Sequence, residues 1–414
     1  MAHRWSTAPV AILLLSLATR VSAQQPGSST PSGTAASAER EDTRTQYPAW
    51  LANSYFSVDL GYLGYGFSNR QLEPGFTAER IDVPHVAARV VPFGHEFNRF
   101  LSAQVSYMRA VRYVSYTNVN GDEAGHHLFV HFGALTLKPQ LPVGRRWSIY
   151  GEAGLGITSR RALVIDEVPV VREAHYASVL LGGGLDGRVT GTLDVTAGWI
   201  YSPGKARSSE PHTMFWSGGF RYTMRPLPPE RVESNRASGF IFPAQLIQVE
   251  YSTGYGYGVN DFVSKTVPIF WGGNVKVARG VAVHYTRNVF HTRKLFALDV
   301  GTSASSWRSR DNGDRFATLS VYPLLRFTLR RARAADFYVS YSLAGPTYIS
   351  RTALDSRDTG NHFTFQDFMG AGVFVGSQRR VSIGLKINHY SNGNLFTKNA
   401  GVKVPLTVFA GYAF

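Results

Sequence analysis

The chain has 414 residues, no cysteine and a formal net charge of +15, from 43 basic and 28 acidic residues. Without cysteine there are no disulfides, no thiolate metal sites and no cysteine nucleophile. Glycine (41), phenylalanine (26) and tyrosine (21) are abundant, whereas charged residues make up only 17%. This composition is typical of outer-membrane barrels, although soluble β-sandwiches also alternate apolar and polar residues, so composition alone supports either class.

Residues 1–23 have the pattern of a secretory signal peptide. His3-Arg4 gives a basic start, Val10 to Ala18 is a short apolar core, and Val21-Ser22-Ala23 is an acceptable cleavage site. The core is too short to cross a hydrocarbon layer of about 30 Å, and no later segment offers the ~20 apolar residues of a transmembrane helix. If the chain spans a membrane, we therefore expect it to do so with strands.

Export also bears on the positive charge. For an exported protein, surplus arginine fits phosphate-bearing lipid headgroups better than nucleic acid, so we expect no nucleic-acid partner. An equally simple explanation is a surplus of solvated arginines in turns.

Two low-complexity breaks divide the chain. The first is rich in Ser, Thr, Pro, Gly and Ala, and the second contains Pro226, Pro228 and Pro229. Such segments have too few apolar residues to order themselves. We predict a flexible linker at 24–50, a first barrel at 51–225, a second linker at 226–240 and a second barrel at 241–414.

The first part contains eight strand-like runs, and an even number of strands is the rule for bacterial outer-membrane barrels. We place the runs at 55–66, 81–92, 100–113, 127–138, 147–158, 175–188, 192–202 and 213–224. The pattern resembles generic eight-stranded outer-membrane barrels, filled by their own side chains. It carries no functional motif.

The second part gives eight or nine runs, of which the last are at 294–307, 315–330, 335–350, 362–376, 381–392 and 404–414. We expect Gly254 to Gly258 to be barrel wall. The predicted fold is therefore all-β, with two tandem antiparallel transmembrane β-barrels of about eight strands each. A single sixteen-stranded pore is disfavoured by the proline-rich break.

The orientation of the second barrel follows from its end. The terminal strand closes on the aromatic Phe414, which fits the periplasmic end of a closing strand. Counting backward, strand 381–392 ascends, Ser377 to Arg380 is a periplasmic turn, and Gly393 to Lys403 is an external loop.

One strand carries residues suited to chemistry. From Ser382 to Asn392 apolar and polar residues alternate, and His389 and Ser391 continue the apolar row that would face lipid. Residues i and i+2 project from one face about 6.5–7 Å apart, a gap that an imidazole can bridge to accept the serine proton. Asn392 and the amides near Gly393 are candidate oxyanion donors. These residues require no metal and no cofactor.

His389 and Ser391 belong to a set of short segments in the second half that together resemble a known protein family. The segments are Phe363-Thr364-Phe365, Gly370 to Val373, His389-Tyr390-Ser391-Asn392 and Asn399 to Val402. They resemble the lipid A 3-O-deacylase (PagL-type, acyloxyacyl hydrolase-related) family of outer-membrane barrels.

The resemblance implies a function and roles for three residues. Ser391 would be the nucleophile, His389 the general base and Asn392 an oxyanion donor. The substrate would be the ester-linked acyl chain at the 3-position of lipid A, in the lipopolysaccharide of the outer membrane.

The chain departs from the family at one position. Enzymes of the family carry a glutamate fourteen residues after the histidine, where this chain has Lys403. A cation there would oppose the imidazolium that forms during the reaction, so either the acid lies elsewhere or the protein is a weak or inactive relative.

Asp367 is the substitute that the sequence offers. It falls in the outward row of the preceding strand, and counting across the short turn places it opposite His389 or Ser391. We hypothesise a Ser391–His389–Asp367 set that hydrolyses an acyl ester. The alternative is a non-catalytic outer-membrane barrel with a scaffold, adhesion or porin-like role.

Overall fold

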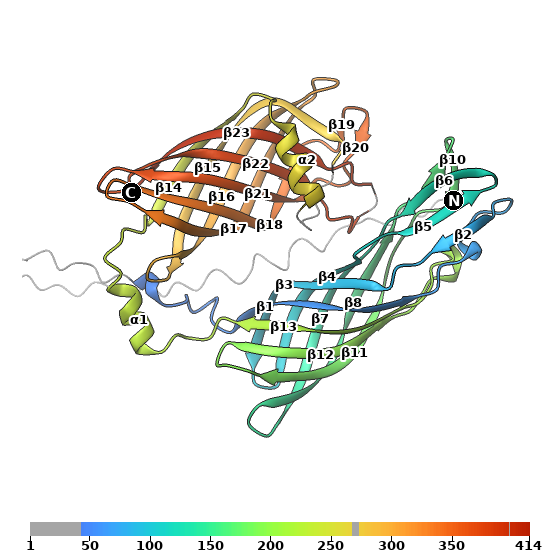
Figure 1. Cartoon of the computed structure of the whole chain (residues 1–414), viewed down its shortest axis with the longest axis horizontal. Coiled ribbons are helices and arrows are strands. Elements are labelled where there is room, and N and C mark those ends of the chain that lie inside the picture. The colour runs from blue at the N-terminus through green and yellow to red at the C-terminus, as the bar shows by residue number, and fades with distance from the viewer. Residues whose placement is uncertain (1–42, 267–272, 397) are drawn as a thin grey trace, which may run out of the picture. The chain divides into compact units, whose positions relative to one another are not determined.

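The computed structural model describes residues 43–266, 273–396 and 398–414, which form two closed eight-stranded antiparallel barrels (Figure 1). The predicted fold class is therefore confirmed, and a single sixteen-stranded pore is excluded. No helix within these residues is long and apolar enough to cross a membrane. The predicted signal peptide and most of the first linker lie outside the described residues.

The first barrel closes because β1 pairs with both β13 and β3. Its strands in chain order are β1 (Ser54–Tyr65), β3 (Val86–Asn98), β4 (Leu101–Ala110), β7 (Val130–Val143), β8 (Trp147–Arg160), β11 (Ala174–Arg188), β12 (Leu193–Ser202) and β13 (Thr213–Thr223). Its loops carry the sheet of β2 (Ala78–Asp82), β5 (Val114–Val119) and β6 (Asp122–Leu128), and the hairpin of β9 (Leu163–Ile165) and β10 (Val168–Val171). Single 3-10 turns lie at η1 (Thr43–Thr45), η2 (Asn69–Gln71) and η3 (Ala206–Ser208).

The second barrel closes through β14, which pairs with β15 and β23. Its strands are β14 (Gln245–Ser252), β15 (Val275–His291), β16 (Phe296–Ser309), β17 (Arg315–Arg331), β18 (Ala335–Ile349), β21 (Phe363–Val375), β22 (Val381–Ser391) and β23 (Val402–Ala413). A small hairpin of β19 (Ala353–Leu354) and β20 (Arg357–Asp358) lies in one loop.

Two helices lie outside the barrel walls. Helix α1 (Pro229–Arg236) falls within the segment predicted as the second linker, and α2 (Tyr257–Thr266) follows β14. The expectation that Gly254 to Gly258 is barrel wall is wrong, because these residues form a loop and the first turn of α2. Gly254 and Gly256 have φ of +80° and +82°, which a strand does not accommodate.

In each barrel, short turns join the strands at one end and long connections join them at the other. In the second barrel the short turns are 292–295, 332–334 and 376–380, and the connections at the opposite end include 253–274, 350–362 and 392–401. Short turns lie on the periplasmic side of outer-membrane barrels. Strand β22 therefore ascends, and Ser391 lies at its outer end.

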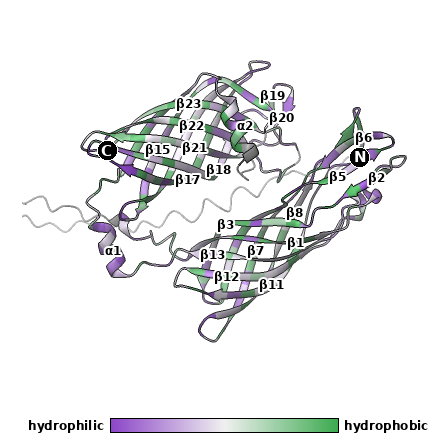
Figure 2. Ribbon diagram, viewed as in Figure 1, coloured by the Kyte–Doolittle hydropathy of each residue, from purple (hydrophilic) through white to green (hydrophobic). Residues whose placement is uncertain are grey.

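Both interiors are filled by ionic networks, whereas both outer walls are apolar. In the first barrel Arg221 lies 2.7 Å from both Asp186 and Asp194, and all three are buried. In the second, Glu250 lies 3.0 Å from His284 and 3.6 Å from Lys386. Figure 2 shows apolar residues recurring along the strands of both barrels. A polar, filled lumen with an apolar exterior is the organisation of a small barrel in a membrane.

Candidate functional site

Strand β22 alternates as the sequence predicts. Val381, Ile383 and Leu385 face outward and are 44–46% exposed, whereas Ser382 and Lys386 face the lumen and are buried. A polar group on the outward row is costly in lipid unless it has a partner or a function.

The inward residues of β22 fix its register from inside the barrel. The Tyr390 hydroxyl accepts hydrogen bonds from Trp307 Nε1 and Gln366 Nε2, both at 3.2 Å. Lys386 Nζ donates to Gln248 Oε1 at 3.0 Å, and Asn388 Nδ2 donates to Glu250. Because a slip of one residue would turn these groups toward lipid, the interior network also fixes which residues face outward.

His389 faces outward and lies directly opposite Asp367 of β21, one of the two pairings expected from the length of the turn. Its Nδ1 is 4.0 Å from Asp367 Oδ2, and the two side chains are 1% and 17% exposed respectively. This distance is longer than a hydrogen bond but short enough for a direct charge interaction. The structure therefore brings His389 and Asp367 together, as counting across the turn predicted.

The backbone of β18 contacts Asp367 on its other side. The Ala344 amide donates to Asp367 Oδ1 at 2.6 Å. Ala344 has φ +37°, and the pairing of β18 with β21 is irregular between Ser342 and Gly345. A bulge of this kind re-aims backbone groups, and a non-glycine residue with positive φ is strained. Alternation of apolar and polar residues predicts neither the bulge nor the positive φ of Ala344.

Ser391 lies two residues beyond His389, half-buried, and pairs with Phe365. Ser391 Oγ accepts a hydrogen bond from the Gly393 amide at 3.4 Å. Within the described residues, no hydrogen bond joins Ser391 Oγ to the His389 imidazole. Gly393 and Asn394 both have positive φ, and Leu395 N donates to Asn392 O at 3.1 Å. This is a type I′ turn, which places a backbone amide next to the serine.

Asn392 is fully buried and holds the loop together. Its Nδ2 donates to Lys398 O at 3.0 Å and to Thr359 O at 3.4 Å, and its Oδ1 accepts from Asn394 N at 2.9 Å. Both donors of the side-chain amide are therefore engaged with loop carbonyls. In this conformation the Gly393 amide, and not the Asn392 side chain, points at Ser391.

Lys403 lies opposite His389 on the other neighbouring strand, β23. The pairing of β22 with β23 shifts between Lys386 and Asn388, where Pro405 cannot donate to the ladder. Lys403 Nζ is 2.9 Å from Asp261 Oδ1 of helix α2. Asp261 was not among the residues predicted for the site, because no helix was expected between β14 and β15.

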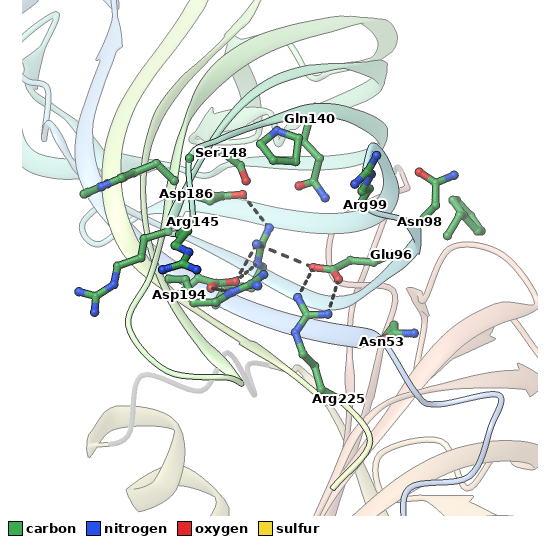
Figure 3. A pocket seen from close by; sticks show the side chains of 17 residues that line it. Asn53, Glu96, Asn98, Arg99, Gln140, Arg145, Ser148, Asp186, Asp194 and Arg225 are labelled. Atoms are coloured by element: carbon green, nitrogen blue, oxygen red, sulfur yellow. Dashed lines mark hydrogen bonds and ion pairs between the residues drawn. The ribbon is translucent and has the colours of Figure 1, made fainter. Parts of the chain in front are cut away.

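Elsewhere among the described residues a serine and a histidine also meet, because Ser54 Oγ lies 3.0 Å from His95 Nδ1 at the short-turn end of the first barrel. Within the described ranges, no group of three or more His, Asp or Glu side chains is arranged to hold a metal ion. A cavity of about 410 Å³ lies at the short-turn end of the first barrel (Figure 3). Its lining includes Ser148 but no histidine, and its carboxylates Glu96, Asp186 and Asp194 are paired with arginine. The lining therefore lacks a base to activate the serine.

Comparison with known proteins points to the same barrel. Residues 279–408 match the family model described as lipid A 3-O-deacylase (PagL). No curated protein matches the chain. The second barrel is therefore similar to an outer-membrane lipid A deacylase, and the chain is a bacterial outer-membrane protein.

Several solved structures are also similar. The outer membrane enzyme PagL is 17% identical, with 41% of this chain and 100% of that chain covered, at a TM-score of 0.30. Neisserial surface protein A is 15% identical, with 41% and 97% covered, at a TM-score of 0.28. Ail of Yersinia pestis is 16% identical, with 41% and 99% covered, at a TM-score of 0.27.

Proposed function

We propose that the second barrel is a lipid A deacylase that hydrolyses the ester-linked acyl chain at the 3-position of lipid A. The observation that carries the proposal is the outward cluster of Asp367, His389 and Ser391 at the outer end of β21 and β22, within the segment that matches the deacylase family. Polar groups in an outward row of a membrane barrel are expensive to keep without a partner or a function.

In the proposed reaction Ser391 Oγ attacks the ester carbonyl and His389 takes the hydroxyl proton. The protonated imidazole then donates that proton to the departing sugar oxygen, leaving an acyl-serine. Water, activated by the same imidazole, hydrolyses the acyl-serine and releases the hydroxy fatty acid. Asp367 stabilises the imidazolium, and the Gly393 amide stabilises the developing oxyanion.

The resting geometry fits an enzyme without substrate. Catalytic hydrogen bonds are often long in the free enzyme and shorten in the complex. In the free protein His389 Nδ1 and Asp367 Oδ2 are 4.0 Å apart, and the proposed reaction requires this contact and the one between Ser391 and the imidazole to shorten.

The outer wall beside the site suits an acyl chain. Ile383 and Leu385, below His389 on the same outward row, are 46% and 44% exposed. Phe363, beside the outer end of the row, is 41% exposed. An acyl chain in the outer leaflet would pack against these residues while its ester bond lies at the level of Ser391.

A non-catalytic barrel is the second candidate, and one observation favours it. Lys403 lies beside His389 at the position where the family has a glutamate, and a cation there disfavours the imidazolium.

Covalent labelling tests the proposal. The purified protein in detergent is treated with a lipophilic fluorophosphonate, and the labelled peptide is identified by mass spectrometry, beside Ser391→Ala and His389→Gln variants. We expect label on Ser391 in the parent and little or none in either variant, because the hydroxyl needs the imidazole to react. Equal labelling of the parent and His389→Gln, or none in the parent, would favour the non-catalytic barrel.

A further inference from the structure

The residue beside His389 on β23 carries the wrong charge for catalysis. His389 pairs directly with Lys403, and residues paired on one face of a sheet have Cβ atoms about 4.5–5.5 Å apart. The proposed reaction places a positive charge on the imidazole. An uncompensated ammonium group on the neighbouring strand would oppose that charge.

Helix α2 supplies the opposite charge. Lys403 Nζ is 2.9 Å from Asp261 Oδ1, and the lysine side chain is only 14% exposed. The Asp261 side chain is 47% exposed, so the lysine end of the pair is shielded from water and the carboxylate end is half open to it. The carboxylate of Asp261 therefore offsets the positive charge of Lys403 on the strand next to His389.

Two further contacts hold α2 against β23. Asn260 is 1% exposed, and its Nδ2 donates to Val404 O at 3.0 Å. A Cβ added to Gly256 would lie 2.7 Å from Leu406 Cβ, so only glycine allows the chain to approach β23 this closely at the start of the helix. Figure 1 shows α2 lying outside the barrel wall.

The opposite side of α2 is apolar. Val259 and Phe262 are 42% and 65% exposed, so the helix turns its polar residues to the barrel and its apolar residues away from it. A helix arranged in this way suits lipid surroundings and not water. His389 is 1% exposed on a row where Ile383 and Leu385 are nearly half exposed, so its end of the row is covered.

We propose that Asp261 is a positioning residue of this site, whose carboxylate neutralises Lys403 and holds α2 against the barrel beside His389. The inference rests on the proposed deacylase function. It explains how a lysine is tolerated where the family carries an acid: the acid is supplied from a helix outside the barrel.

The test compares Asp261→Asn, Lys403→Gln and the double variant, with lipid A deacylation followed by mass spectrometry. Asp261→Asn leaves the lysine uncompensated and should lower kcat about 10- to 100-fold. The double variant removes both charges and should recover to within about threefold of the parent. Asp311→Asn, which removes another outer-loop aspartate paired with arginine, is the matched control and should behave as the parent.

The charge-swapped variant Asp261→Lys/Lys403→Asp gives the sharpest result. It keeps the ion pair and puts a carboxylate beside His389, so it should be at least as active as the parent. A purely structural role for Asp261 predicts that the double variant stays as impaired as Asp261→Asn, and that result would overturn the proposal. Full activity of Asp261→Asn would overturn it as well.

Hydrogen exchange of the α2 amides is the readout that does not depend on activity. Loss of the ion pair in Asp261→Asn should speed exchange in residues 257–263 about fivefold, and the charge swap should restore it. Unchanged exchange in Asp261→Asn would overturn the proposal even in an active enzyme. A parent without deacylase activity would instead refute the proposed function, while the exchange data still decide whether Asp261 and Lys403 hold α2.

Discussion

The two barrels are built alike inside and differ on their outer walls. Each lumen holds buried ion pairs, around Arg221 in the first barrel and Glu250 in the second. On the outer wall of the first barrel, β12 and β13 pair Trp199 with Trp216. On the corresponding strands of the second barrel, β22 and β23 pair His389 with Lys403.

The difference separates what closes a barrel from what the protein does. Ion pairs inside a lumen satisfy one another and fix strand register, so they recur in both barrels. A tryptophan pair near the outer rim is what an aromatic girdle needs. A histidine, a lysine and an aspartate on the same kind of surface are costly in lipid without a partner or a function, so the second wall is the candidate site.

Removing the base should give the largest effect. His389→Gln keeps the size of the side chain and removes its ability to take a proton, so deacylation should fall about 10³-fold or more. Trp199→Phe, at the corresponding wall of the first barrel, should retain activity. Comparable activity of the two variants in a lipid A assay would show that the two walls do not differ in function.

Removing the central cation of the first lumen should mainly affect folding. Arg221→Met leaves Asp186 and Asp194 buried without their main partner, which should cost roughly 3–5 kcal/mol of unfolding free energy. Urea unfolding in detergent micelles measures it, with the exposed Arg145→Met as a control near the same end of the barrel. Deacylation by the folded fraction should not change, and a parallel loss of activity would contradict the division between lumen and wall.

Weakening the acid should have an intermediate effect on the reaction. In Asp367→Asn the side chain still accepts the Ala344 amide but no longer stabilises the imidazolium, so kcat should fall about 100-fold with little change in KM. Asp358→Asn, in an outer loop, is the control. Full deacylation by Asp367→Asn would remove Asp367 from the site.

The smallest effect concerns the outer loops of the first barrel. Burial raises the pKa of Glu210 to about 7, although Arg160 beside it acts in the opposite direction. A carboxyl with a raised folded-state pKa contributes stability that is full below its unfolded value near 4.5 and is lost as pH rises through 7. The loops should therefore lose roughly 2–3 kcal/mol between these pH values.

Limited proteolysis across the pH range measures this loss. Cleavage of the first-barrel loops should become faster from pH 4.5 to 7 in the parent, and Glu210→Gln should remove the pH dependence. The loops of the second barrel provide the internal comparison. A parent whose loops resist protease equally at both ends of this range would contradict the role given to Glu210.

Much of the fold could be predicted because membrane strands obey a simple rule. Alternation of apolar and polar residues located β8, β11 and β22 to within about two residues. The short turn at 376–380 fixed the pairing of β21 with β22, and so placed Asp367 opposite His389. Both results depend only on period and turn length.

The rest of the site depends on contacts between distant residues, which the alternation of apolar and polar residues cannot predict. Helix α2 follows a glycine-rich segment whose sequence resembles a strand. Its Asp261 pairs with Lys403, which lies 142 residues further along the chain. The bulge that aims the Ala344 amide at Asp367 depends on the packing of β18 against β21. The Asn392 side chain was predicted to donate a hydrogen bond to the oxyanion. In the structure its donors bind the carbonyls of Thr359 and Lys398, and the sequence alone does not show that these carbonyls lie close to Asn392.

The most direct test of the central claim is mass spectrometry of lipid A after lipopolysaccharide is incubated with the purified full chain, beside Ser391→Ala. The account predicts that the parent removes one hydroxyacyl group from the 3-position and that the variant removes none. Intact lipid A with both proteins, in detergent and in liposomes alike, would contradict the deacylase function and leave the second barrel as a scaffold with a vestigial site.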